Sequence, residues 1–492
     1  MTTYLHGVYS QEVPTSVRPP ITALAGLPVV VGAAPVVLGT RTNVNKPVLA
    51  ASFAEFVTKL GNCPASLYSS YGLCEFARVY FGLYGVGPAV FVNVLDPDDA
   101  GHMASVARAG LAWASAETSK TISVFGIDHT TLVLDDGALV PSAYALTTDY
   151  TLAYDANGYT VVTRVSTGAM GSGALPDCHL TYDKLAPAGV DAADIVGTAT
   201  AGGAYTGLWC VEDVYPRLQL APGMILAPGW SQDSAVAAAM VARGGSINGG
   251  VFKALAVTDL DPDEYEIADY SEAAAWKSDN GYTAAGQVCC WPLVTLGDEV
   301  HHLSCHFAGL ANQVDAASGG TPYVSPSNRA MRIDGACLED GTEVFLSQDQ
   351  ANILNGQGII TALNFTGWRL WGNRTAAYPA SSDPKDTFVP IRRMTLWLGN
   401  TLVLTYFSQV DAALTRRLID SIVDSANIFL NGLKGAGSIL GGEVVFAEAD
   451  NPSTSLLNGQ GSFRIYWTPP PPAEALTFII EFDAANLASL FA

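Results

Sequence analysis

Charged residues are scarce in this sequence, and the basic ones are the scarcest. Only 14% of the 492 residues are charged, and 46 acidic residues against 24 basic ones give a formal net charge of −22. Proteins that bind the phosphates of nucleic acid or of anionic lipid use clustered Lys and Arg. The composition therefore argues against direct contact with nucleic acid or with a membrane.

The chain also lacks a long unbroken hydrophobic run and any C-x-x-C pair. Residues 21–39 are uncharged and apolar, but Pro28, Pro35 and three glycines interrupt them, so we expect neither a signal peptide nor a membrane segment. The eight cysteines are scattered without the density of a disulfide scaffold, which is typical of reduced thiols in a cytoplasmic fold.

Motifs for common enzyme chemistry are absent or incomplete. No G-x-x-x-x-G-K-[ST] loop is present, so ATP is not the expected energy source. The chain around Ser231 reads PGWSQD instead of G-x-S-x-G, and neither Ser172 nor Ser246 completes that motif. Residues 435–440 lack the third glycine of a dinucleotide loop and follow a predicted helix. We expect no catalytic residues.

One group of side chains could bind a metal: His301, His302, Cys305 and His306. His302 and His306 would share one face of a helix at a spacing of four residues. No second ligand cluster accompanies them, so a helix with polar and small packing residues is the preferred interpretation. No metal or other cofactor is expected.

Apolar residues make up 49% of the chain, and the charged residues are too few to cover the surface of an ordinary soluble monomer. A chain of this length is also too long for one ordinary domain. We therefore expect several domains and extensive burial between the subunits of an assembly.

Predicted strands and helices alternate through much of the chain, which indicates an α/β fold. The strands are Val29–Gly32, Ala89–Val94, Met224–Ala227 and Ala254–Val257, and the helices are Phe53–Leu60 and Ser234–Arg243. Short strands alone occupy the region between about residues 121 and 182, so an all-β insertion interrupts the α/β domain. Its strands are Thr131–Leu134, Asp149–Tyr154, Tyr159–Arg164 and Leu180–Tyr182, with a hairpin turn at Asp155–Gly158.

Both ends of the chain have the pattern of tethered strands. Tyr4–Val13 is extended and precedes a linker at Val17–Pro20. An amphipathic helix is predicted at Asp411–Leu433, and Pro469–Pro472 then separates it from a final strand at Ala475–Phe482.

Segments along the whole chain resemble, in order, the contractile tail sheath proteins of myophages and of phage-tail-like bacteriocins. They include MTTYLHGVYSQEVP, VVVGAAP, NKPVLAASFAEFVTKLG, GPAVFVNVLDP, DYTLAYDANGYTVVTR, LAPGMILAPGWSQDSAV, YVSPSNRAMRIDG, ILNGQGIITALN, LWGNRT and NPSTSLLNGQGSFRIYWTPPPPAEALTF.

The resemblance implies an α/β fold: a subtilisin-like central domain without a catalytic triad, a β-rich outward-facing insertion, an α+β C-terminal domain facing the tube, and extended terminal arms. The expected domains are an arm and linker at 1–20, the central domain at 21–120 and 200–380, the insertion at 121–199, the C-terminal domain at 381–472 and a strand arm at 473–492.

The function implied is that of a structural subunit. It would polymerise as hexameric rings stacked helically around the tail tube and contract to drive the tube through the host cell envelope, with the energy stored at subunit interfaces. The expected partners are other copies of the chain, the tail tube protein, and baseplate and tail terminator proteins. The expected place is the virion tail, assembled in the bacterial host cytoplasm.

Subunits that move while attached need tethers, and strand exchange onto a neighbour's sheet supplies them. The alternative is that both terminal strands close the sheet of their own subunit. The predicted arm contacts are Tyr4, His6, Val8, Tyr9 and Val13 at the N-terminus and Leu476, Phe478, Ile480 and Phe482 at the C-terminus, with linkers at Pro19, Pro20, Pro469, Pro470, Pro471 and Pro472.

Arg416, Arg417 and Lys434 are the predicted contacts with an acidic tube surface. Ordinary pairing along the helix, for instance of Arg416 with Asp420, is the alternative. Two other classes of protein stay open beside the sheath: a hydrolase with the subtilisin fold, and a shell protein that does not contract.

Overall fold

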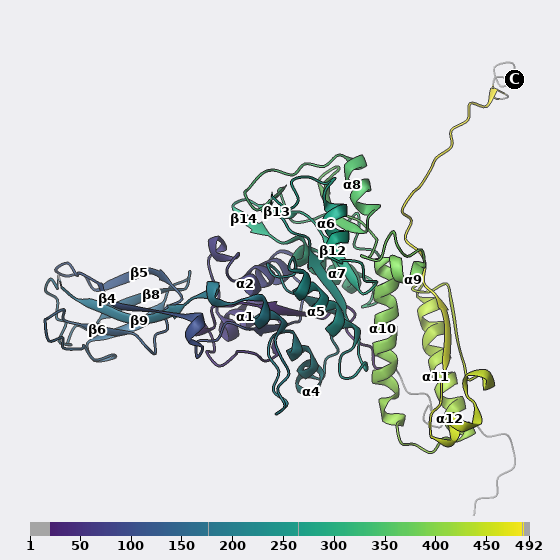
Figure 1. Ribbon diagram of the computed structural model, residues 1–492, viewed down its shortest axis with the longest axis horizontal. Helices are drawn as coiled ribbons and strands as arrows, with labels where there is room; N and C mark the ends of the chain where they lie inside the picture. Colours follow the sequence, from purple (N-terminus) through teal and green to yellow (C-terminus); the bar gives the residue numbers. More distant parts are fainter. Residues whose placement is uncertain (1–19, 176, 264, 485, 487–492) are drawn as a thin grey trace, which may run out of the picture.

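A computed structural model describes residues 20–175, 177–263, 265–484 and 486 of the chain. Three regions follow one another along the longest axis of the molecule (Figure 1). A β-rich region forms one end, an α/β region forms the middle, and long helices with a hairpin form the other end. The expected mixed α/β class is confirmed, whereas the division into domains stays a prediction.

The middle region is built on one eight-stranded sheet with the order β17-β16-β12-β11-β10-β1-β3-β2. Its six inner strands are parallel, and β2 and β17 at the two edges are antiparallel to their neighbours. The strands are β1 Pro28–Gly32, β2 Val48–Ala50, β3 Ala89–Asn93, β10 Met224–Leu226, β11 Leu255–Asp259, β12 Gln287–Cys290, β16 Ile359–Asn364 and β17 Trp368–Trp371.

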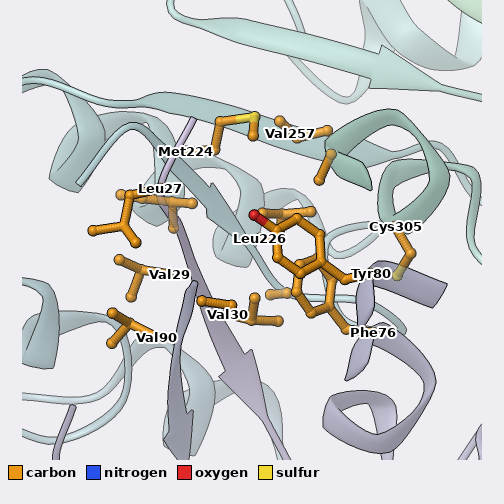
Figure 2. Packing of buried hydrophobic residues seen from close by; sticks show 14 of the residues in the cluster. Leu27, Val29, Val30, Phe76, Tyr80, Val90, Met224, Leu226, Val257 and Cys305 are labelled. Atoms are coloured by element: carbon orange, nitrogen blue, oxygen red, sulfur yellow. The ribbon is translucent and has the colours of Figure 1, made fainter. Parts of the chain in front are cut away.

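These inner strands are continuous apolar runs because helices cover both faces of the sheet. Every residue of β1, β3 and β11 is buried. Figure 2 shows side chains of β1 and β10 packed with Phe76 and Tyr80, which lie in the continuous helical segment formed by α2 and Arg78–Leu83. The core of the molecule therefore lies along this sheet.

Eight helices belong to the middle region and connect its strands. They are α1 Phe53–Leu60, α2 Gly72–Ala77, α3 Ala192–Val196, α4 Val214–Leu218, α5 Ser234–Gly245, α6 Ala273–Asp279, α7 Leu303–Ala317 and α8 Gln348–Asn355. A small antiparallel sheet lies beside them, with β13 Leu293–Leu296, β14 Glu299–His301 and β15 Gly335–Cys337.

The β-rich region consists of two three-stranded sheets, β4-β9-β6 and β5-β8-β7. Its strands are β4 Met103–Gly110, β5 Ser119–Phe125, β6 Val133–Asp135, β7 Tyr150–Tyr154, β8 Tyr159–Arg164 and β9 His179–Leu185. The four strands expected from the sequence are present, and the predicted turn joins β7 to β8 with Asp155 Oδ1 accepting from the amides of Asn157 and Tyr159. The strand β4, which the sequence pattern did not predict, pairs with β9 and begins before residue 121.

The remaining end contains four helices and one hairpin: α9 Pro384–Thr387, α10 Val389–Tyr406, α11 Arg416–Gly435, α12 Ser453–Leu457, β18 Gly441–Val445 and β19 Arg464–Thr468. A buried ion pair between Arg393 of α10 and Asp315 of α7 attaches this end to the middle region. Asn400 of α10 adds hydrogen bonds to both backbone groups of Lys253.

One sequence-based boundary differs from the structure. The long helix begins at Arg416 and not at Asp411, because the Thr415 side chain caps it by accepting from the amide of Leu418. Residues 475–482, predicted to form a strand on another copy, pair with no strand among the described residues of this single chain, so that prediction stays open. None of the helices that the structure describes is long and apolar enough to span a membrane.

Candidate assembly site in the C-terminal region

The hairpin β18–β19 packs one face against α11, and the two lie side by side in Figure 1. Leu430 of α11 is buried with Ile439 and Val444 of the hairpin segment. A Cβ atom at Gly442 would come within 3.1–3.2 Å of the Ile439 and Leu430 side chains. Glycine at this position therefore lets the strand approach the helix closely.

The two outer edges of this hairpin differ. On β18 the Asn427 side chain of α11 accepts from the amide of Val444 at 2.8 Å and donates to its carbonyl at 3.1 Å. The backbone groups of Val444 thus point away from β19. Val444 lies opposite Ile465 in the antiparallel pair, so the backbone groups of Ile465 also point outward. Because this direction repeats every second residue, the backbone groups of Trp467 point outward as well.

The outward backbone groups of β19 have no partner within the described chain. No hydrogen bond from that part of the protein reaches the amide or carbonyl of Ile465 or Trp467. The edge of β18 is held by Asn427, whereas the edge of β19 is open. An open edge of this kind is a template for another strand.

The C-terminal segment supplies exposed apolar side chains close to this hairpin in sequence. Leu476, Phe478, Ile480 and Phe482 are 76%, 86%, 94% and 82% exposed. In Figure 1 the segment runs away from the body of the subunit. Of the linker prolines, Pro469 is buried and Pro471 is exposed. Whether these residues add to a neighbouring sheet stays a prediction.

The N-terminal end of the described chain is fastened to α10. The amides of Ile21 and Ala23 donate to the hydroxyls of Thr405 and Thr401 at 3.1 and 3.2 Å, and the Trp397 indole donates to the Ala23 carbonyl at 2.9 Å. Pro20 is the first described residue. The predicted arm and linker residues Tyr4, His6, Val8, Tyr9, Val13 and Pro19 lie outside the described residues.

The three predicted tube contacts do not form one cluster. Arg416 donates to Asp420 at 2.8 Å on the same helix, which is the alternative considered from the sequence. In the described chain neither Arg417 nor Lys434 has a carboxylate within ion-pair distance, and both are exposed. Arg417 and Lys434 are separated by most of α11, or about 25 Å along its axis. Their contact with a tube stays a prediction.

Ser231, whose surrounding sequence does not match G-x-S-x-G, is part of a buried hydrogen-bond network. Ser231 is fully buried, and its hydroxyl accepts from the amide of Asp259 at 2.9 Å. Asp259 also accepts from the amide and the hydroxyl of Ser304 at 2.9 and 2.5 Å. Burial raises the pKa of Asp259. In the described chain no hydrogen bond joins His302 to Ser231, so the geometry of an activated nucleophile is not assembled.

His302 instead pairs with Glu75 of α2. The imidazole lies 3.0 Å from Glu75 Oε2, and the His302 amide donates to Oε1 at 2.5 Å. Burial opposes the charge of His302, but the Glu75 carboxylate outweighs it and raises the pKa of His302 to about 9. Burial likewise opposes the charge of Glu75, but His302 lowers the pKa of Glu75 overall. The pair is therefore ionised at neutral pH.

The predicted helix face of His302 and His306 is wrong, because His302 lies just before α7 and its side chain makes no hydrogen bond to the first turn. His306 lies beside His301, with ring nitrogens 3.3 Å apart, and its other nitrogen lies 3.0 Å from the Tyr84 hydroxyl. Burial lowers the pKa of both His301 and His306. No group of three metal-binding side chains occurs among the described residues.

Sequence reasoning missed the hairpin edge and the helix that carries the N-terminal segment. The hairpin begins with Gly441 and Gly442, which indicate a turn more than a strand. The helix α10 is buried on several sides, so its apolar residues do not form the single stripe that marks a surface helix.

Two comparisons with known proteins give matches. The chain is 31% identical over 507 residues to a tail sheath protein of Burkholderia phage BcepMu, and the match covers 99% of this chain and 98% of that protein. It is 30% identical over 330 residues to a putative prophage major tail sheath protein of Pseudomonas aeruginosa, with 63% of this chain and 81% of that protein covered. No protein-family model matches the chain.

Solved structures with a similar fold are themselves sheaths. The sheath complex of the extracellular contractile injection system PVC, in its contracted state, matches with a TM-score of 0.57 and 14% identity over 99% of both chains. The helical sheath of the anti-feeding prophage in its contracted state matches with a TM-score of 0.57 and 13% identity over 98% of this chain and 100% of that chain. At these identities the likeness concerns the fold.

Proposed function

Because this chain belongs to the tail sheath protein family, we propose that it polymerises around a tail tube by adding its terminal arms to the sheets of neighbouring copies. The chain is a structural subunit of a contractile sheath in a phage or phage-like tail. We further propose a site at which one copy attaches to the next. We place the attachment at the open edge of β19.

The edge of β19 that is open in the described chain and the exposed apolar side chains of residues 476–482 carry the proposal. Ile465 and Trp467 offer outward backbone groups, and residues 475–482 offer extended backbone and alternating apolar side chains. Main-chain hydrogen bonds would hold the arm, and alternate side chains would fill pockets. Each large apolar side chain contributes about 1.5–3 kcal/mol when it becomes fully buried.

Strand addition also suits a lattice that moves. Backbone hydrogen bonds between two strands depend little on where the rest of either subunit lies, provided that the chain can turn where each arm leaves its subunit. The subunits can then slide from a long lattice into a short one without releasing each other. The free energy of contraction would come from surface buried in the shorter lattice, with no nucleotide consumed.

The remaining parts of the proposal follow the family. Hexameric rings would stack helically on the tube and meet a baseplate at one end and a terminator at the other, after assembly in the host cytoplasm. The middle region would have subtilisin-like topology without its catalytic triad, the β-rich region would face outward, and the C-terminal region would face the tube. The chain would have no enzymatic activity, in keeping with Ser231 being sealed in the core.

Deletion of residues 475–492 tests the attachment. We expect the shortened chain to remain a folded soluble subunit and to form no long tubes, as seen by negative-stain electron microscopy. A matched pair of substitutions refines the test, because alternate arm residues face opposite sides. Phe478→Ser should weaken assembly strongly, whereas Ile479→Ser should weaken it little.

Deletion of residues 1–13 should have the same effect as deletion of the C-terminal arm. Normal tubes from either deleted chain would contradict strand exchange by that arm. Equal effects of Phe478→Ser and Ile479→Ser would contradict the one-sided packing of the added strand.

A further inference from the structure

The C-terminal arm is tied to its own subunit at one polar contact before it becomes exposed. We propose that Arg374 and Glu474 form a clasp that sets the direction in which the arm leaves the subunit, so that the arm is oriented before a neighbour binds it. The inference rests on the proposed exchange of this arm. It concerns how the arm is presented, not where it binds.

Two parallel hydrogen bonds make the contact. Arg374 Nε donates to Glu474 Oε1 at 2.8 Å, and Arg374 Nη2 donates to Glu474 Oε2 at 2.6 Å. This bidentate arrangement fixes the carboxylate in orientation as well as in position. It spans 100 residues of sequence, from the LWGNRT segment to the arm.

Arg374 is itself held rigidly. Its guanidinium lies over the rings of Tyr378 and Phe388, at 4.4 and 3.8 Å, and its Nη1 donates to the Thr387 hydroxyl at 3.2 Å. The backbone on either side of it is bonded to the segment before α10, through Thr375 and Asn373. Arginine stacked and bonded in this way loses little further freedom when it binds a carboxylate.

The segment between the hairpin and the clasp, residues 469–474, has the composition of a stiff spacer. Four consecutive prolines favour an extended conformation of about 3.1 Å per residue. One end is fixed where the Leu440 amide donates to the Thr468 carbonyl at 2.7 Å, and the other end is fixed at Glu474. A stiff segment held at both ends determines the direction of the chain beyond it.

Beyond the buried Pro469, a cavity separates much of the spacer from the body of the subunit. A cavity of about 850 Å³ lies under residues 470–476, lined on the other side by Tyr323, Asn328, Asn352 and Trp371 among others. Beyond Glu474 the apolar side chains from Leu476 to Phe482 are exposed. Breaking the clasp would therefore free the spacer to move as well as the arm.

The two arms start at opposite ends of α10. Ile21 is bonded to Thr405 near the last turn of the helix, whereas Arg374 lies over Phe388 just before the first turn. Thr405 follows Phe388 by 17 positions, which correspond to about 25 Å of helix. A clasped subunit therefore presents its C-terminal arm from the end of α10 opposite to the end that holds Ile21.

The clasp is tested with a nitroxide label at Ala475→Cys in the full-length chain. All eight native cysteines are buried, so the new thiol is the accessible one to label. We expect Glu474→Gln to increase the mobility of the label in the soluble subunit and to raise the critical concentration for assembly about two- to five-fold. The wild-type label should gain mobility in 1 M salt, which screens the pair, whereas the label in Glu474→Gln should not.

Glu481→Gln is the matched control, because it removes the same charge from the same arm beyond the clasp. It should leave label mobility unchanged. Equal mobility of wild type and Glu474→Gln would overturn the clasp, and so would an equal change in Glu481→Gln. Increased mobility with unchanged assembly would overturn its orienting role. Failure of strand exchange would appear separately, as normal tubes after deletion of residues 475–492.

Discussion

At the residue scale, a filled polar pocket occupies the place where α/β sheets commonly bind ligands. Asp259 ends β11, Ser231 follows β10, and Glu75 and His302 lie beside them at the carboxyl ends of the parallel strands. Here the polar groups bond one another. Their protonation therefore affects the stability of the fold.

The pair of His302 and Glu75 predicts a pH dependence of stability. His302 has a folded pKa of about 9 against 6.5 for the ordinary group, so its contribution is complete below pH 6.5, falls between pH 6.5 and 9, and is lost above 9. The shift corresponds to about 3 kcal/mol. Urea unfolding measures the difference in the free energy of unfolding between the wild type and a double variant with His302→Gln and Glu75→Gln. We expect this difference to shrink by about 3 kcal/mol between pH 6.5 and pH 9.

A pH-independent difference between the two proteins would contradict an ionised pair.

Below pH 6.5 two other histidines matter. The pKa values of His301 and His306 are lowered in the folded protein, so these two imidazoles take up protons more readily in the unfolded chain. Both proteins should lose stability there.

At the scale of elements, the predictions that rested on the spacing of apolar residues agree with the structure. The helix α1 and the strand β8 lie where spacing placed them, since each buries a regular face. The partner of His302 was not predictable, because Glu75 is 227 residues away in sequence. The open edge of β19 was also not predictable, because it depends on Asn427 of α11 holding the neighbouring strand.

The helix α11 carries the prediction about the tube. Arg416 and Arg417 lie at the N-terminal end of α11, where the helix dipole disfavours positive charge. Asp420 offsets the charge of Arg416, whereas Arg417 has no carboxylate within ion-pair distance in the described chain. Replacing both with Glu should weaken assembly on tubes several-fold and spare tube-free polymer, measured by co-sedimentation with purified tubes. Arg217→Glu is a control, since Arg217 also pairs with a carboxylate four residues away. Unchanged binding to tubes would remove α11 from the tube interface.

At the scale of the molecule, buried contacts join the regions of the subunit. The α/β region and α10 are joined by buried polar contacts, including Arg393 with Asp315. Among the described residues, the outward backbone groups of Ile465 and Trp467 have no partner, and the side chains of residues 476, 478, 480 and 482 are exposed. The order of strands and helices along the chain followed from the sequence pattern, whereas no local pattern reveals what partner an open strand edge takes.

The most direct test is cryo-electron microscopy of polymers formed by the full-length chain. We expect hollow cylinders in which residues 475–482 of one subunit form a strand on β19 of another, bonded to the backbone of Ile465 and Trp467. Cylinders in which that segment returns to its own subunit, or in which the edge of β19 stays empty, would contradict strand exchange.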